Sequence, residues 1–321
     1  MGHAQSFGAK ELAVIYSLDD AASGEIAHLY ATKRAVPAAN VIGIHVDNVD
    51  VLRPDRLAAL RRDVFARLPT SVESLLLVWA RPYAVGCMSI TTAFAAGYRA
   101  AFCDPGCGAT ERNPLYDAQD WLPADTVGWW PAMLLPTSDA RLAEDLIVRG
   151  IAADASMPDG TVYLIHTQDA VRNVRAANYS LVTADIGGRI RVLERTTPVT
   201  GEIADVMGYF TGVVSVQELP RLRFRPGAVA DHLTSTGGVL YGGTQMSALA
   251  WLRRGASGSY GSVTEPCNHV EKFPNPIVLF DHYLHGETLL ESYWKSVAMP
   301  GQGLFIGEPL ARPFAGSVSL R

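Results

Sequence analysis

The first 80 residues alternate short apolar runs with stretches of helical periodicity, and this alternation constrains the fold most strongly. Apolar runs occupy residues 12–16, 40–46 and 75–79, and helical patterns occupy residues 23–34 and 54–68 between them. The third run is apolar at every position, as expected of a central strand in a parallel sheet. A β-α-β-α-β order predicts right-handed crossovers and helices on both faces of the sheet. The chain is therefore predicted to be an α/β protein with a mostly parallel sheet.

The composition excludes two classes of protein. The 321 residues carry 27 Lys and Arg against 32 Asp and Glu, a net charge of −5, and 48% of them are hydrophobic. A disordered chain would be less hydrophobic and more charged, and a dedicated nucleic-acid binder would have a basic surplus. No apolar run is long enough to cross a membrane. The length fits a single α/β domain, or two lobes over residues 1–156 and 157–321.

The middle of the chain departs from this pattern. Residues 87–131 are rich in Gly, Pro and aromatic side chains and show no period, so we interpret them as an irregular insertion over the sheet edge. Beyond it, strands are expected at residues 133–135, 161–165, 190–193, 206–210, 258–263 and 304–306, and helices at residues 139–155, 169–177, 245–254 and 286–296.

Parallel sheets place functional groups beyond the carboxyl ends of their strands, so the polar residues that follow the predicted strands are the candidate site. His232 and Ser235, which stand before the Gly237-Gly238 turn, are added as candidates for base and nucleophile. His269 and Cys267, which follow the predicted strand at residues 258–263, are a second such pair. The remaining members, proposed to bind substrate, are Asp19, Arg81, Ser89 and Glu265.

Each candidate also has a structural interpretation. Asp19 or Asp20 can cap the following helix, and Ser235 can belong to an ordinary turn. A metal site from Asp19, His166, His232, Glu265 and His269 is conceivable, but no local ligand spacing supports it. No cofactor and no metal are expected.

The four cysteines allow several states. Pro105-Gly106 marks a turn that brings Cys103 and Cys107 within disulfide range, although free thiols or a metal site are alternatives. Cys87 and Cys267 are expected at the same sheet edge, so a disulfide between them competes with a catalytic or an inert thiol at Cys267.

Several longer motifs are more specific than any single residue. The chain reads Arg-Pro-Gly-Ala-Val-Ala-Asp-His-Leu-Thr-Ser at residues 225–235 and Glu-Pro-Cys-Asn at residues 265–268. Together with residues 36–41, 87–91, 246–252, 255–261, 286–294 and 307–310, these motifs resemble an uncharacterised bacterial family of predicted exported proteins. The resemblance implies a periplasmic or secreted protein with disulfides, whose signal peptide was removed before Gln5 and left residues 2–4 as a remnant. The N-terminus by itself also allows a cytoplasmic location.

A more distant resemblance is to the caspase and gingipain clan of cysteine peptidases. Tyr209-Phe210-Thr211-Gly212 is similar to the strand that precedes the clan's histidine, and Leu233-Thr234-Ser235 to the strand that precedes its cysteine. Gly307-Glu308-Pro309 is similar to the clan's closing turn. Val213 stands in place of the histidine, and no cysteine follows Leu233. The resemblance implies a caspase/gingipain-like fold without the His/Cys dyad.

These observations support two main functions. The first is an exported hydrolase that acts on a peptide-like or amide bond. The alternative is a non-catalytic envelope protein on a peptidase-like scaffold, which binds a small molecule, a peptide or a glycan with the insertion's aromatics, Tyr98, Phe102, Tyr116, Trp121, Trp129 and Trp130. A metalloenzyme is the third hypothesis. Neither a nucleic-acid partner nor a membrane span is expected, and the sequence leaves the oligomeric state open.

Overall fold

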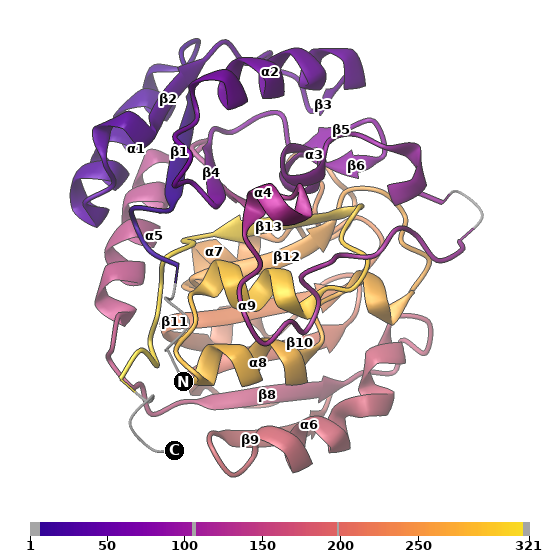
Figure 1. Ribbon diagram of the computed structural model, residues 1–321. Coiled ribbons are helices and arrows are strands. Elements are labelled where there is room, and N and C mark those ends of the chain that lie inside the picture. The colour runs from indigo at the N-terminus through magenta and orange to yellow at the C-terminus, as the bar shows by residue number, and fades with distance from the viewer. Residues whose placement is uncertain (1–6, 105–106, 198, 317–321) are drawn as a thin grey trace.

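The computed structural model describes residues 7–104, 107–197 and 199–316. Its centre is one ten-stranded sheet with the order β2-β1-β4-β7-β13-β12-β11-β10-β8-β9 (Figure 1). Within the described residues, no helix is both long and apolar enough to cross a membrane. Residues 2–4, where a signal-peptide remnant was expected, lie outside the described part of the chain.

The first half of the sheet follows the predicted β-α-β order. Its strands β1 (Leu12–Ser17), β2 (Val41–Ile44), β4 (Ser74–Val78) and β7 (Ala132–Leu135) pair in parallel, and the helices are α1 (Ala21–Arg34), α2 (Pro54–Arg67) and α5 (Ala140–Ala153). Asp20 caps α1 through the amide of Ala22, and Asp139 caps α5 through the amide of Leu142. Pro54 occupies the first turn of α2, where its missing N–H costs nothing.

The second half continues the same sheet. It contains β8 (Thr161–His166), β9 (Arg191–Thr196), β10 (Ile203–Gly212), β11 (Leu222–Leu233), β12 (Gly258–Ser262) and β13 (Gly303–Gly307). In the spatial order β9-β8-β10-β11-β12, each strand pairs in parallel with the next. Strand β13 pairs antiparallel with β12 and meets β7 at the pair Ile306–Leu134. Its α-helices are α6 (Tyr179–Ile186), α7 (Leu249–Arg254), α8 (Pro276–Leu284) and α9 (Leu289–Ser296). Short 3-10 turns lie at Asn173–Asn178, Leu219–Arg221 and Val270–Lys272, and another precedes β2 in the first half at Ala38–Asn40. The sheet is therefore mostly parallel, as predicted.

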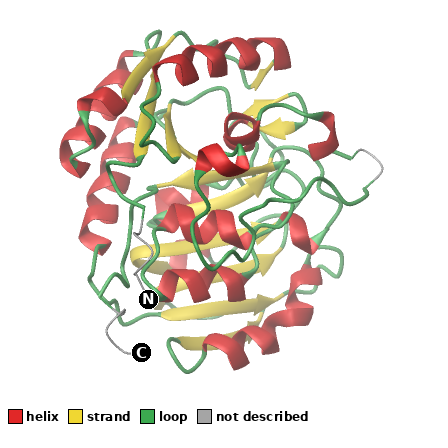
Figure 2. Cartoon of the chain, viewed as in Figure 1, coloured by secondary structure: helices red, strands yellow, loops and turns green. Residues whose placement is uncertain are grey.

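Helices cover both faces of this sheet (Figure 2). Tyr209 and Phe210 are neighbours on β10, so their side chains point to opposite faces. The Tyr209 ring lies 5.4 Å from Trp251 of α7, and the Phe210 ring lies 6.1 Å from Phe280 of α8. Helices α7 and α8 therefore pack on opposite faces, which confirms the expected arrangement.

The 12-residue strand β11 is absent from the sequence-based prediction. Pro226 and Gly227 interrupt its apolar pattern, and Gly227 has a φ of 84°. Pairing with β12 begins only at Val229, and pairing with β10 contains register shifts near Val206. The early part of β11 therefore has no β12 beside it. Proline is tolerated there because its missing N–H is not needed for pairing with a second strand.

The insertion, residues 87–131, consists mainly of loops but also contains short regular elements (purple to magenta in Figure 1). These are β6 (Met88–Ser89), α3 (Ile90–Ala96), a 3-10 turn (Ala100–Phe102) and α4 (Ala124–Val127). A small second sheet joins β6 to β5 (Ala84–Val85) and β3 (Val51–Leu52). Ser89 starts α3 because its hydroxyl accepts the amide of Thr92 at 3.1 Å.

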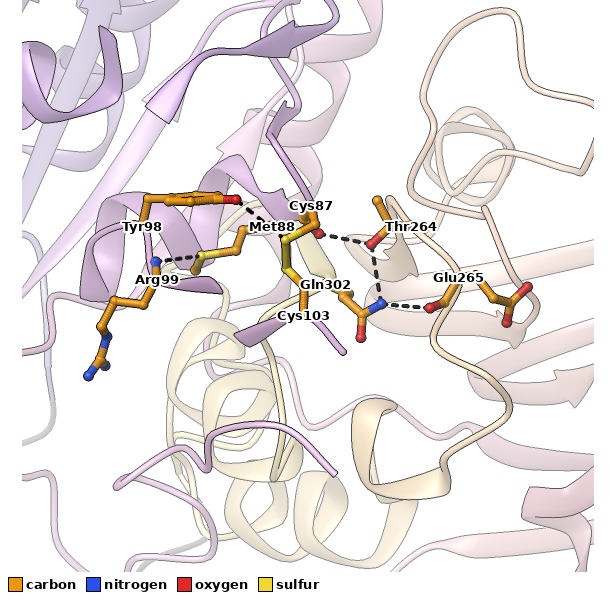
Figure 3. Close-up of a disulfide and its surroundings, with 8 residues drawn as sticks. All are labelled: Cys87, Met88, Tyr98, Arg99, Cys103, Thr264, Glu265 and Gln302. Carbon is orange, nitrogen blue, oxygen red and sulfur yellow. Dashed lines mark hydrogen bonds between the residues drawn. A yellow bond between two sulfur atoms is a disulfide. The ribbon is translucent and has the colours of Figure 1, made fainter. Parts of the chain in front are cut away.

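The disulfides differ from both expected pairings. Cys87 is bonded to Cys103 with a Cα–Cα distance of 5.9 Å (Figure 3). Cys107 is bonded to Cys267 with a Cα–Cα distance of 5.3 Å. The 3-10 turn before Cys103 returns the chain to the start of α3, where Cys87 lies. Cys107, four residues further on, lies against the loop after β12. Two disulfides indicate an oxidising environment.

Candidate functional site

Loops from distant parts of the chain meet at the carboxyl edge of the sheet. Arg81 follows β4 in the first half, and Tyr241 follows β11 in the second. The Arg81 guanidinium carbon lies 4.1 Å from the centroid of the Tyr241 ring, in cation–π contact, and Arg81 also forms an ion pair with Asp50. The ring of Tyr83 lies 6.1 Å from that of Tyr241. The strand-end loops of both halves therefore form one continuous surface.

His232 lies inside β11 rather than in a loop, and it is completely buried. The Trp251 indole N–H donates to its Nδ1 at 3.0 Å, so the proton sits on Nε2, which donates to the Met246 carbonyl at 2.9 Å. Burial lowers the pKa of His232 to about 4. The ring is neutral at physiological pH, and neither nitrogen is available to a substrate.

This buried histidine predicts a pH-dependent stability. An unfolded histidine has a pKa of about 6.5, so protonation favours the unfolded chain between pH 6.5 and pH 4. We expect its stabilising contribution to be complete above pH 6.5 and to fall by about 2 to 3 kcal/mol by pH 4.5. Glutamine at this position keeps one donor and one acceptor but does not titrate. The unfolding free energy of His232→Gln should therefore fall by about 2 to 3 kcal/mol less between pH 7.5 and pH 4.5 than that of the wild type. Parallel urea-denaturation profiles for the two proteins would contradict the assignment.

Ser235 lies half-buried in the turn that follows β11. Its neighbours hold that turn: the Thr234 hydroxyl and the Thr236 amide both donate to Gln245 Oε1, at 2.8 and 2.7 Å. Arg172 Nε donates to the Thr234 hydroxyl at 3.1 Å. In the described part of the chain, no hydrogen bond joins the Ser235 side chain to a histidine, so the expected Ser235–His232 pair is not assembled.

The second nucleophile–base pair is not assembled either. The Cys267 sulfur is part of a disulfide, and its amide donates to Glu265 Oε1 at 2.7 Å. The Glu265 carbonyl accepts from Gln302 Nε2 at 2.6 Å (Figure 3). His269 is half-buried and precedes the 3-10 turn at Val270–Lys272. Within this loop the side chains of Cys267 and Glu265 stabilise the fold.

The remaining candidates, Asp19, Ser89 and Arg81, lie in different surroundings. Asp19 is exposed after β1, where its carboxylate contacts His45 Nδ1 at 2.9 Å and accepts the amide of Val46 at 3.0 Å. Ser89 is buried and serves as the cap of α3. Arg81 is the only one of these three with an aromatic partner at the edge described above.

Sequence reasoning missed two arginines that organise this edge. Buried Arg175 donates to buried Asp231 and, at 3.1 Å, to the Thr211 carbonyl. Burial raises the pKa of Asp231, and Arg175 opposes that shift. Arg172, in the same loop, pairs with Asp169 at 3.0 Å and keeps part of its side chain exposed. No motif marks either arginine, because Asp231, the partner of Arg175, and Thr234, which Arg172 contacts, are distant in sequence.

The described residues contain no group of three or more His, Cys, Asp or Glu side chains placed to hold a metal ion. Val213, which the sequence resemblance aligns with the clan's histidine, packs against an apolar cluster that includes Tyr209 and Trp251.

The comparisons with known proteins concern the fold. No family model and no curated protein matches the sequence. A solved structure described as a protease is similar with a TM-score of 0.55 and 11% identity, over 95% of this chain and 78% of that one. The complex of the pro- and mature domains of RgpB from Porphyromonas gingivalis is similar with a TM-score of 0.52 and 10% identity, over 94% of this chain and 79% of that one. The chain therefore has the α/β fold of gingipain-like proteases.

Proposed function

We propose that this protein is a non-catalytic, exported binding protein on a protease-like scaffold, and that it binds peptides at the carboxyl edge of its sheet. The observation that carries the proposal is the bonding of His232, since both ring nitrogens are engaged inside the core. The proposal is also supported by the disulfide at Cys267, which leaves no free thiol there, and by the apolar side chain of Val213, which cannot act as a base.

The edge nevertheless offers groups that suit an extended peptide. Arg172 is partly exposed between the loops after β8 and β11, and its pair with Asp169 leaves guanidinium donors for a peptide carbonyl or carboxylate. Gly242 and Gly243 lie exposed in the loop that carries Tyr241, so a ligand backbone can approach closely there. The two disulfides favour function in an oxidising compartment, which agrees with export.

Labelling and binding measurements on the same protein test this function. We expect no labelling by a fluorophosphonate serine probe or by a thiol-directed peptidase probe, and no cleavage of a mixed peptide library. We expect the immobilised protein to retain peptides from that library. Arg172→Gln should weaken their binding about tenfold, because a charged hydrogen bond contributes roughly 1.5 kcal/mol or more.

Arg53→Gln is the matched control, because Arg53 is exposed and, among the described residues, forms an ion pair only with its neighbour Asp55, at 3.0 Å. Serine-probe labelling that disappears in Ser235→Ala would establish the hydrolase instead. Failure to retain any peptide, or equal weakening by both arginine variants, would contradict peptide binding at this edge.

A further inference from the structure

A pocket lies within the insertion, away from the carboxyl edge. It has a volume of about 510 Å³ and is lined by Ala96, Arg99, Glu111, Arg112, Pro114, Val127, Gly128 and Trp129. These residues come from the end of α3, the following loop and the end of α4. Trp129 lies just before β7 begins, and the Trp130 amide donates to the Ala95 carbonyl, which places the pocket at the amino end of β7. A volume of this size is typical of small-molecule sites.

The walls of the pocket are firmly held. The Trp129 ring is buried and packs edge-on against Phe102 at 5.5 Å and Trp294 at 6.1 Å. Gly128 has a φ of 72°, and open space lies where its side chain would be. A ligand would therefore meet a fixed aromatic wall and an unobstructed backbone.

The lining of the pocket carries more positive than negative side chains. Arg99 and Arg112 line it together with a single carboxylate, Glu111. Arg99 pairs with Glu111 at 2.7 Å, and Arg112 pairs with Glu271 at 2.8 Å, outside the lining. All four side chains are substantially exposed, and such surface ion pairs contribute little. A ligand carboxylate can therefore replace Glu111 or Glu271 as a partner at small cost.

A third guanidinium reinforces this potential. Half-buried Arg61 of α2 donates to the Phe94 carbonyl at 3.0 Å and lies against Gly97, the residue after Ala96 of the pocket wall. Among the described residues, no carboxylate forms an ion pair with it, and burial lowers the pKa of Arg61. A half-buried cation without an acidic partner favours an anion nearby.

We infer that this insertion pocket binds a small carboxylate-bearing molecule, whose carboxylate pairs with Arg99 and Arg112. Guanidinium groups recognise carboxylates through paired, charge-assisted hydrogen bonds. The inference concerns a site separate from the peptide surface proposed above, and it does not depend on that proposal.

Calorimetric titration of the intact protein tests this inference. The probes are glucuronate and N-acetylglutamate, which distinguish a sugar acid from an amino-acid source, with glucose and N-acetylglutamine as their neutral counterparts. We expect at least one acid to bind at least tenfold more tightly than its neutral counterpart, and its affinity to fall as salt is raised. Arg99→Gln and Arg112→Gln should each weaken that acid about tenfold.

Arg62→Gln is the matched control, because Arg62 is an exposed residue of α2 that does not line the pocket. Arg172→Gln, at the carboxyl edge, should also leave acid binding unchanged. The inference is overturned if neither acid binds, if a neutral counterpart binds equally well, or if Arg62→Gln weakens binding as much as the pocket variants do.

Discussion

Replacing Cys107 and Cys267 together by serine should lower the free energy of unfolding by about 5 kcal/mol, the largest effect that we expect from any single link. This disulfide closes a loop with a sequence separation of 160 residues, and the entropy that it removes from the unfolded chain grows with loop length. It also ties the insertion to the loop after β12, which no other covalent bond within the described residues does. Urea denaturation under non-reducing conditions measures the change.

The second disulfide provides the internal comparison. Cys87 and Cys103 are 16 residues apart, so replacing both by serine should cost about 3 kcal/mol by the same chain-entropy argument. The test is which of the two double-serine variants loses more unfolding free energy, since both disulfides are removed by the same kind of substitution. A larger loss for Cys87 and Cys103 would contradict the entropic explanation and would indicate that local packing dominates.

Asp231→Ala should lower the free energy of unfolding by about 3 to 5 kcal/mol, because it leaves the buried guanidinium of Arg175 without its counter-charge. The side chains of both residues are at least 95% shielded from solvent, with exposed fractions of 4% for Arg175 and 0% for Asp231. Arg175 also donates to the carbonyls of Thr211 and Pro274, so its displacement should loosen three segments at the carboxyl edge. Urea denaturation gives the stability, and protease susceptibility of the loop after β8 reports the loosening.

A variant that lacks both charges separates the ion pair from its surroundings. Arg175→Met combined with Asp231→Ala removes both charges, and we expect it to recover part of the loss seen in Asp231→Ala alone. Asp55→Ala, which breaks the exposed pair with Arg53, should change stability by less than about 1 kcal/mol. A loss below about 1 kcal/mol in Asp231→Ala would show that the ion pair does not stabilise the fold.

Most of the sheet could be predicted from the sequence because burial imposes a visible pattern. A strand covered on both faces needs apolar side chains at successive positions, as Leu75, Leu76 and Leu77 show. Strand β11 was not predicted, because Pro226 and Gly227 interrupt its apolar pattern. The structure tolerates this interruption because β12 does not pair with the first half of β11. Helix α8 was missed for a related reason, since most of its nine residues are buried and it therefore lacks a polar stripe that would mark a helical period.

The sequence could place the candidate residues near the ends of strands, but it could not predict which of them contact one another. His232 and Ser235 are three residues apart, a spacing that allows a loop to bring them together. Because His232 lies within β11, its side chain is directed into the core toward Trp251, and Ser235 lies beyond the strand end. The actual partners of the turn, Arg172 and Gln245, come from other segments and leave no local signal.

The sequence by itself determined the α/β class, the crossover order of the first half, the helix cap at Asp139, and the mostly irregular course of residues 87–131. These features depend on contacts between residues close in the chain, or on burial that every strand residue records in its side chain. Only the tertiary structure decided which cysteines pair, which residue neutralises Asp231, and that His232 is a core residue. Those outcomes depend on distances between segments more than ten residues apart, which no periodicity encodes.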